Sequence, residues 1–426
     1  MNLMKRRFLA TVLAAGMASG ASAQTLRIGL FDDPDTLDPS LGRVSGGMQV
    51  LRNLCDRLLI NDGVGGFTPQ LATGYTWSPD RRTLTLKLRN GVKFHDGEPF
   101  NAEAVKYNLE RNMTLQGSSM KVALGAIEKV EAVDPLTVKL QLKEPAVQLL
   151  LFLADRPGIM ISPKAAKAAG DKFGNHPVCA GPFKFVERVP QGRILAERFD
   201  GYWNRQQIKL QRIEYYPVID STVRLANLQS GQLDLIENVA PTDFKRMRSE
   251  KAYKTASTRS DGFFALFLNV SQTPEGQALN DPRVREALDL AIDRETLVKV
   301  VFDGLYTPGN QWVSPNSPYY NKSIPVPKRN VERARQLLRE AGKPNLSFTL
   351  IVPPDRDRQE AAQVIQSMLA DAGVNMKLET KENVAMLRTA IDGKAEAIFS
   401  FWTGKADPDG NIIDLETCGR PLNFGR

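Results

Sequence analysis

Apolar strand-length runs and helix-spaced apolar stripes alternate toward the C-terminal end of the chain. Strands are expected at Leu346–Val352, Val374–Thr380 and Ala395–Phe401, with helices at Asp357–Ala372 and Glu382–Asp392 between them. A strand–helix–strand–helix–strand order predicts a parallel sheet joined by right-handed crossovers. The pattern therefore places the chain in the α/β class.

The segment Phe67–Phe100 has a different pattern, in which apolar and polar residues alternate with a period of two. The clearest alternation is Thr83–Leu88, which follows a turn at Ser78-Pro79-Asp80. A helix with Asn101 as its N-cap is expected next, over Ala102–Arg111. This part of the chain is predicted to be a β-rich unit.

An acid-rich segment lies between the first expected strand, Gln24–Leu30, and a helix expected within Val44–Ile60. The segment Asp32–Pro39 holds four carboxylates within seven residues. Because these acids lack the ligand spacing and the closing Glu of a calcium loop, turn and capping roles are favoured over a metal site.

The segment Ala395–Asn411 changes abruptly from an apolar run to turn residues. Phe401 and Trp402 stand at the change, and Asp407 and Asp409 follow in the turn. A buried strand that opens into a turn with an aromatic wall and fixed charges is a common ligand site in α/β proteins. On the residues alone, a core strand followed by a surface loop explains the pattern equally well.

The first residues, Met1–Ala23, have the pattern of a cleaved secretory signal peptide: a basic head, an apolar stretch and Ala21-Ser22-Ala23 before Gln24. No later segment is long and apolar enough for a membrane helix, so a soluble periplasmic protein is predicted. Removing three basic residues lowers the net charge from +8 to +5. Bases scattered among acids, in an exported protein, argue against nucleic-acid binding.

Catalytic signatures are absent from the sequence. The two histidines are far apart, and no nucleophile-elbow, zinc-protease, dinucleotide or phosphate-loop motif occurs. We therefore expect no enzyme activity, no cofactor and no metal. The three cysteines, in an oxidising compartment, predict one disulfide and one free thiol, with three pairings possible.

A long segment, Leu86–Val105, resembles the hallmark of the extracellular solute-binding proteins of family 5, the peptide-type receptors of ABC importers. Further segments resemble the same family: Pro177–Phe185, Glu197–Trp203, Gly231–Leu235 and Asn280–Arg294. Members of the family bind dipeptides, oligopeptides, glutathione, opines or nickel. The resemblance implies a type II-like periplasmic binding protein, with two lobes joined by a hinge and an extra β-rich domain.

The resemblance also implies a domain organisation. Residues 24–66 with 178–262 would form lobe I, 67–177 the extra domain, and 263–426 lobe II, after a signal peptide at 1–23. Family members continue beyond the point that corresponds to Arg426, so a C-terminally truncated chain with an incomplete lobe II is expected.

Site residues follow from the same resemblance. Main-chain groups around Phe401, Trp402 and Thr403 would pair with a peptide backbone, and Asp407 would meet a ligand cation. Arg358 would bind a ligand carboxylate, although a solvated first-turn charge explains it too.

The resemblance places Cys179 and Cys418 where the chain approaches the hinge, so we expect these two to pair. Cys55, within an apolar helix, is expected to be a core residue.

The function implied is capture of small peptides or peptide-like solutes and delivery to the permease subunits of an ABC importer in the inner membrane, by a monomer. The alternatives are a truncated remnant without function, a chemosensory module or a chaperone-like periplasmic binder.

Overall fold

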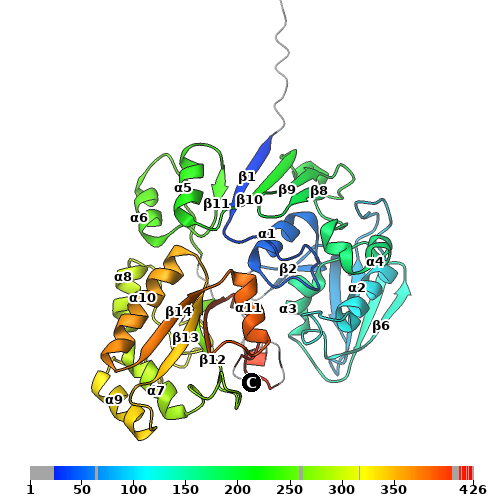
Figure 1. The fold of residues 1–426 in the computed structure, drawn as a ribbon. Coiled ribbons are helices and arrows are strands. Elements are labelled where there is room, and N and C mark those ends of the chain that lie inside the picture. Colours follow the sequence, from blue (N-terminus) through cyan, green and yellow to red (C-terminus); the bar gives the residue numbers. More distant parts are fainter. Residues whose placement is uncertain are drawn as a thin grey trace, which may run out of the picture.

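The computed structural model describes residues 24–62, 66–258, 262–315, 317–404, 412–413, 415–418, 420 and 422–424. The predicted signal segment 1–23 and Asp407 lie outside these residues. Within them, the strands form one five-stranded, two four-stranded and one two-stranded sheet, with helices packed around them (Figure 1). The predicted α/β class is confirmed.

The lobe I sheet has the strand order β11-β1-β10-β9-β8. Its strands are β1 (Thr25–Leu30), β8 (Phe183–Val189), β9 (Arg193–Arg198), β10 (Arg212–Pro217) and β11 (Leu235–Ile236), and its helices are α1 (Ser45–Leu54), α5 (Ser221–Gln229) and α6 (Pro241–Ser249), with the short η3 (Arg205–Gln207). Strand β1 runs parallel to both β10 and β11. The carboxyl ends of these three strands therefore lie at one edge of the sheet, and Asp32 and Glu237 follow two of them.

A second, antiparallel sheet has the order β4-β5-β7-β6. Its strands are β4 (Ala72–Trp77), β5 (Thr83–Leu88), β6 (Ile127–Asp134) and β7 (Thr137–Leu142). A separate two-stranded sheet pairs β2 (Leu59–Asn61) with β3 (Phe67–Pro69). The helices of this part of the chain are α2 (Ala102–Thr114), α3 (Leu149–Leu153), η1 (Arg156–Gly158), α4 (Pro163–Ala169) and η2 (Gly170–Asn175). The alternation predicted for β5 is confirmed, because its leucines are buried. The predicted cap is also confirmed, since Asn101 Oδ1 accepts the Ala104 N–H at 2.9 Å.

The lobe II sheet has the order β12-β15-β13-β14. Its strands are β12 (Phe263–Leu268), β13 (Ser347–Val352), β14 (Asn375–Thr380) and β15 (Ala397–Trp402), and its helices are α7 (Pro282–Ala291), α8 (Arg294–Val301), α9 (Val331–Glu340), α10 (Arg356–Asp371) and α11 (Asn383–Ile391). Strands β13, β14 and β15 are parallel, as the sequence pattern predicts, while β12 is an antiparallel edge strand. Helix α10 follows β13, which runs parallel to β15. The start of α10 and the end of β15 therefore lie at the same edge of this sheet.

Each of the three larger sheets has its own apolar core of buried residues. One core gathers residues between Leu58 and Ala180, another those between Leu279 and Phe399, and a third joins Leu30 and α1 to β8, β9 and β10. The exact domain boundaries stay a prediction.

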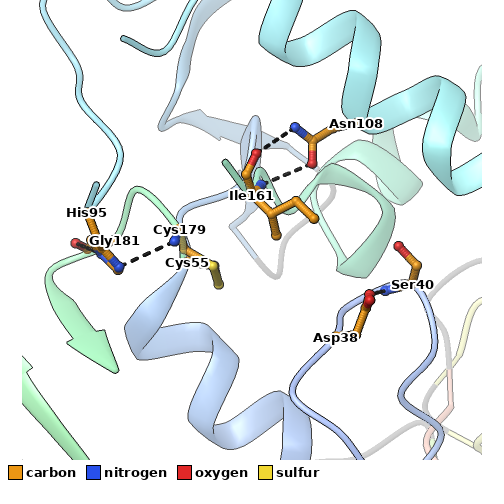
Figure 2. Close-up of a disulfide and its surroundings, with 8 residues drawn as sticks. All are labelled: Asp38, Ser40, Cys55, His95, Asn108, Ile161, Cys179 and Gly181. Atoms are coloured by element: carbon orange, nitrogen blue, oxygen red, sulfur yellow. Dashed lines mark hydrogen bonds between the residues drawn. A yellow bond between two sulfur atoms is a disulfide. The ribbon is translucent and has the colours of Figure 1, made fainter. Parts of the chain in front are cut away.

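The disulfide joins Cys55 to Cys179, and Cys418 is free and exposed, so the predicted pairing of Cys179 with Cys418 is wrong. Cys55 follows the last turn of α1, and the Gly181 N–H donates to Leu54 O at 2.9 Å. That backbone contact brings the approach to β8 against the end of α1, where both cysteines are buried (Figure 2). The sequence pattern does not reveal this contact.

His95 lies beside the disulfide in a structural role. Its Nδ1 accepts the Cys179 N–H at 3.3 Å, and its Nε2 lies 3.1 Å from Gly181 O (Figure 2). These contacts fit a neutral ring with the proton on Nε2. Burial lowers the pKa of His95 to about 4 and keeps it neutral.

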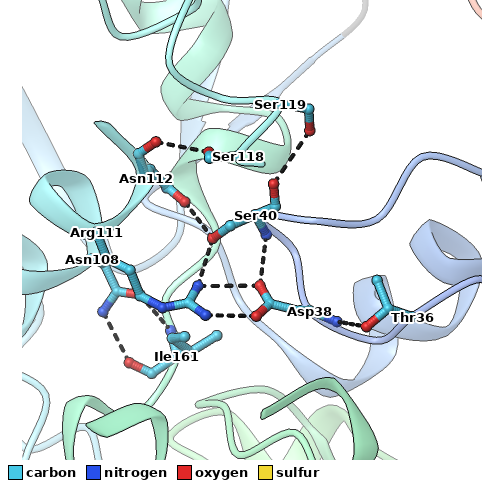
Figure 3. Close-up of polar contacts among 9 residues, drawn as sticks. All are labelled: Thr36, Asp38, Ser40, Asn108, Arg111, Asn112, Ser118, Ser119 and Ile161. Atoms are coloured by element: carbon cyan, nitrogen blue, oxygen red, sulfur yellow. Dashed lines mark hydrogen bonds and ion pairs between the residues drawn. The ribbon is translucent and has the colours of Figure 1, made fainter. Parts of the chain in front are cut away.

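The acid-rich segment is held by ion-pair and turn contacts. Asp38 forms a buried bidentate ion pair with Arg111 of α2, at 2.6 Å and 3.1 Å (Figure 3). Ser40 accepts from the same guanidinium and donates to Asn112 Oδ1 at 2.6 Å. Asp38 Oδ1 also accepts the Ser40 N–H at 2.9 Å, which is the turn role predicted for this segment, and the ion pair is an addition to it.

Candidate ligand-binding site

The carboxyl edge of the lobe II sheet carries an aromatic wall. Phe401, at the end of β15, is 37% exposed and lies 5.1 Å from the ring of Phe264, which is opposite it in the strand register. Tyr306 packs against Phe264 at 6.0 Å. Trp402 ends β15 and Thr403 follows it as an exposed residue. The structure therefore brings the three predicted residues of this strand to the edge of the sheet.

Arg358 lies at the same edge, in the first turn of α10. Asp355 is the N-cap of this helix, and its Oδ2 accepts from Arg358 Nε at 2.6 Å. Arg358 is only 7% exposed, so the alternative of a solvated charge does not hold. Its Nη1 and Nη2 groups form no hydrogen bond with any residue that the structure describes. The neighbouring Arg356 instead pairs with Glu360 at 2.7 Å, where both side chains are exposed.

Two carboxyl groups lie at the facing edge of the lobe I sheet. Asp32 Oδ1 accepts the Gly46 N–H at 2.6 Å, while Oδ2 is buried without a hydrogen-bond partner among the described residues. Burial raises the pKa of Asp32 to about 7, although the charge of Arg358 acts in the opposite direction. Glu237 Oε1 accepts the Phe31 N–H at 3.3 Å, and burial raises the pKa of this side chain too.

A buried arginine supports the lobe I edge. The guanidinium of Arg224, on α5, donates to the backbone carbonyls of Val218, Ile219, Glu237 and Asn238. Asp357, in the first turn of α10, is close enough to act on its charge. Burial raises the pKa of Asp357 to about 6, and the neighbouring Asp355 adds to the rise.

The two edges face each other across the boundary between the lobes, which is the proposed cleft: the charge of Arg358 acts on Asp32, and that of Asp357 acts on Arg224. Figure 1 draws α5 and α6 of lobe I above α8 and α10 of lobe II, and Lys245 on α6 pairs with Asp303, just after α8, at 3.0 Å. Carboxyl edges of parallel strands are where open α/β sheets bind ligands. The arrangement offers an aromatic surface, a guanidinium with unused donors and carboxyl groups whose pKa burial raises, which suits a small solute bearing charged ends.

Several of these residues were not predicted from the sequence. Asp32 was assigned a turn or capping role, and Glu237, Asp357 and Tyr306 were not singled out. For Asp32 and Glu237 the sequence held a partial signal, because Glu237 directly follows a strand and Asp32 comes two residues after the end of one. The sequence does not show that these two strands, β1 and β11, lie side by side. Asp407 lies outside the described residues.

The described part of the chain lacks two other structural features. No group of three or more His, Cys, Asp or Glu side chains there is arranged to hold a metal ion. No helix there has the length and apolarity needed to cross a membrane.

The fold and the cleft define a two-lobed solute-binding protein of the type II periplasmic class. A family model described as "Bacterial extracellular solute-binding proteins, family 5 Middle" matches residues 66–420. The chain belongs to this family, and the predicted resemblance is confirmed.

Among curated relatives, the glutathione-binding protein GsiB of Pectobacterium atrosepticum is 34% identical over 414 residues, which is 94% of this chain and 79% of that protein. GsiB of Salmonella typhimurium is 33% identical, with 93% and 77% covered.

Solved structures share the fold. The murein tripeptide binding protein MppA of Escherichia coli matches with a TM-score of 0.86 at 23% identity, covering 95% of this chain and 84% of that one. The binding protein AgaA of A. tumefaciens R10, in complex with agropinic acid, matches with a TM-score of 0.80 at 28% identity, covering 88% and 77%.

Proposed function

We propose that this protein captures small peptides or peptide-like solutes in the periplasm and delivers them to the permease of an ABC importer. It would act there as a monomer after removal of the signal peptide 1–23, without catalysis and without binding nucleic acid. The glutathione-binding relatives support this role over a chemosensory module, a chaperone-like binder or a remnant.

The observation that carries the proposal is the position of Arg358. Its side chain is buried at the cleft edge, one nitrogen is engaged by Asp355, and the remaining guanidinium donors have no partner among the described residues. A planar guanidinium with unused donors suits a ligand carboxylate. The aromatic wall at Phe401 would lie against apolar parts of the same ligand. Asp407 remains the proposed partner of a ligand cation.

The proposal is tested by calorimetric titration and thermal melts of residues 24–426 with glutathione, di- and tripeptides, and agropinic acid. A bound ligand at 100 times its dissociation constant should stabilise the protein by about 2.7 kcal/mol. Absence of binding by this whole set would refute the proposal.

Matched variants test the assigned carboxylate partner. Arg358→Gln should weaken binding by about 1.5–3 kcal/mol and should remove the preference for a free ligand carboxylate over its amide. Arg356→Gln, in the same helical turn but paired with Glu360 on the exposed face, should bind like the wild type. Equal effects of the two substitutions would contradict the assignment.

A further inference from the structure

An aromatic cluster of four rings lies at the carboxyl edge of the lobe II sheet. Its centre is Phe264 of β12, whose ring centroid lies 5.1 Å from that of Phe401 and 6.0 Å from that of Tyr306. Phe302, which follows α8, stacks on Phe264 at 6.0 Å and meets the ring of Tyr306 edge-on at 4.6 Å. The aromatic cluster therefore joins the end of β15 to the chain segment after α8.

The four rings of the aromatic cluster differ in exposure. Phe302 is buried and Phe264 is half-buried, whereas Phe401 is 37% exposed and Tyr306 is 46% exposed. Exposed apolar side chains that are scattered singly over a surface are common and need no function. Here, both exposed rings are held by contact with the same ring, that of Phe264. They therefore form one apolar surface whose shape is fixed before any ligand binds.

The direction of α8 brings Tyr306 toward the start of α10. The Asp293 N–H, at the beginning of α8, donates to Met368 Sδ near the end of α10 at 3.4 Å. The last two residues of α8 line a groove with Glu360, which is close to the start of α10. The two helices are therefore antiparallel neighbours (Figure 1). The chain that leaves α8 and carries Tyr306 consequently runs toward the first turn of α10, where Arg358 lies.

The same chain segment meets lobe I. Lys245 Nζ, on α6 of lobe I, lies 3.0 Å from Oδ2 of Asp303, which stands between Phe302 and Tyr306 in the chain. The aromatic cluster is therefore at the boundary between the lobes. Although lobe I is in contact at Asp303, Tyr306 remains 46% exposed. A solute between the lobes can consequently reach its ring.

We infer that Tyr306 and Phe401 form an apolar subsite that binds an aromatic or large apolar side chain next to the ligand carboxylate on Arg358. This inference rests on the proposed function. It narrows the substrate class to peptides and peptide-like solutes whose carboxyl-terminal residue carries such a side chain. Burial of apolar ligand surface against the two rings adds affinity, and edge-to-face contact adds more when the side chain is aromatic. Tyr306 thereby determines specificity, in addition to the carboxylate partner.

The test is calorimetric titration of residues 24–426 with two dipeptides, glycyl-phenylalanine and glycyl-alanine, which differ only in the carboxyl-terminal side chain. The wild type should bind glycyl-phenylalanine about tenfold more tightly than glycyl-alanine, because the phenyl ring is buried against the subsite. Tyr306→Ala should lower this ratio of affinities to about threefold or less. Tyr306→Phe keeps the ring and should therefore keep the wild-type ratio.

The matched control is Tyr319→Ala, which removes an exposed tyrosine outside the aromatic cluster and should keep the wild-type ratio. Melts without ligand confirm that each variant is folded. The subsite is refuted, and the proposed function stands, if the wild type binds the two dipeptides equally, if it binds glutathione but neither dipeptide, or if Tyr306→Ala has the same ratio as Tyr319→Ala. If the wild type binds no dipeptide, glutathione or agropinic acid, the proposed function fails and this inference fails with it.

Discussion

Replacing Asp32 by asparagine should stabilise the protein, and the gain should grow with pH. Asp32 is 8% exposed, and only its Oδ1 has a hydrogen bond, from the Gly46 N–H at the start of α1. An asparagine Oδ1 can still accept from that N–H. The substitution therefore keeps the contact with α1 and removes only the ability of the side chain to become negatively charged.

The size of the effect follows from the pKa of Asp32, which burial raises from 3.8 to about 7. As the pH rises, the carboxyl group of Asp32 keeps its proton in the folded state after it has lost it in the unfolded state. The stability that this bound proton contributes is complete below the unfolded pKa and is lost as the pH rises through 7. At about 1.4 kcal/mol for each pH unit of separation, the full loss is about 4 kcal/mol. About 2 to 3 kcal/mol of this loss falls between pH 5 and pH 8.

Urea unfolding of the wild type and Asp32→Asn at pH 5 and pH 8 measures this difference directly. The variant should gain about 2 to 3 kcal/mol more at pH 8 than at pH 5 relative to the wild type. Asp392→Asn, at an exposed aspartate after α11, is the control and should show no such pH-dependent gain. If Asp32→Asn loses stability at pH 8, Asp32 is a charged partner of Arg358 and the reasoning from burial is wrong.

Two further predictions concern contacts that hold the fold. Replacing Cys55 and Cys179 by alanine should lower the free energy of unfolding by about 5 kcal/mol, because the disulfide closes a loop with a sequence separation of 124, whereas Cys418→Ala should leave the melting temperature unchanged. Arg111→Ala should lower the free energy of unfolding by about 3–5 kcal/mol because it leaves Asp38 buried and unpaired. Urea unfolding of the double variant Arg111→Ala with Asp38→Ala should show a smaller loss than the sum of the losses of the two single variants.

Local patterns predicted local structure well. The buried leucines of Thr83–Leu88, the Asn101 cap and the parallel strands of lobe II all follow from periodicity and capping chemistry within one short segment. The disulfide was mispredicted because its partners are far apart and are joined through the contact of Gly181 with α1.

The candidate site was predictable only in part for the same reason. Arg358 and the end of β15 were found from family resemblance, since each lies in a segment with a recognisable sequence. The role of Asp32 depends on β1 lying beside β11 and opposite α10, which are hundreds of residues away in the chain. No local signal distinguishes Asp32 from the other acids of its segment, although their environments differ.

The different environments of Asp32 and the other acids of its segment support the proposed position of the ligand site. The fold can satisfy a buried carboxylate when nothing else is required of it, as the bidentate pairing of Asp38 with Arg111 shows. A raised pKa alone does not mark a binding site either. Burial raises that of Asp56 to about 6, yet Asp56 accepts hydrogen bonds from Trp203, Tyr202 and Gln70.

On both walls of the proposed cleft, a charged or ionisable side chain keeps hydrogen-bonding capacity for a ligand. Asp32 keeps a buried oxygen without a hydrogen bond, and Arg358 keeps donors without an acceptor among the described residues. The buried oxygen of Asp32 has an energetic cost that a packed interior normally avoids, whereas the unused donors of Arg358 are available to a ligand carboxylate. A solute with charged ends would satisfy both groups in the proposed site, so its selectivity would come from the hydrogen-bonding capacity that the fold leaves unused there.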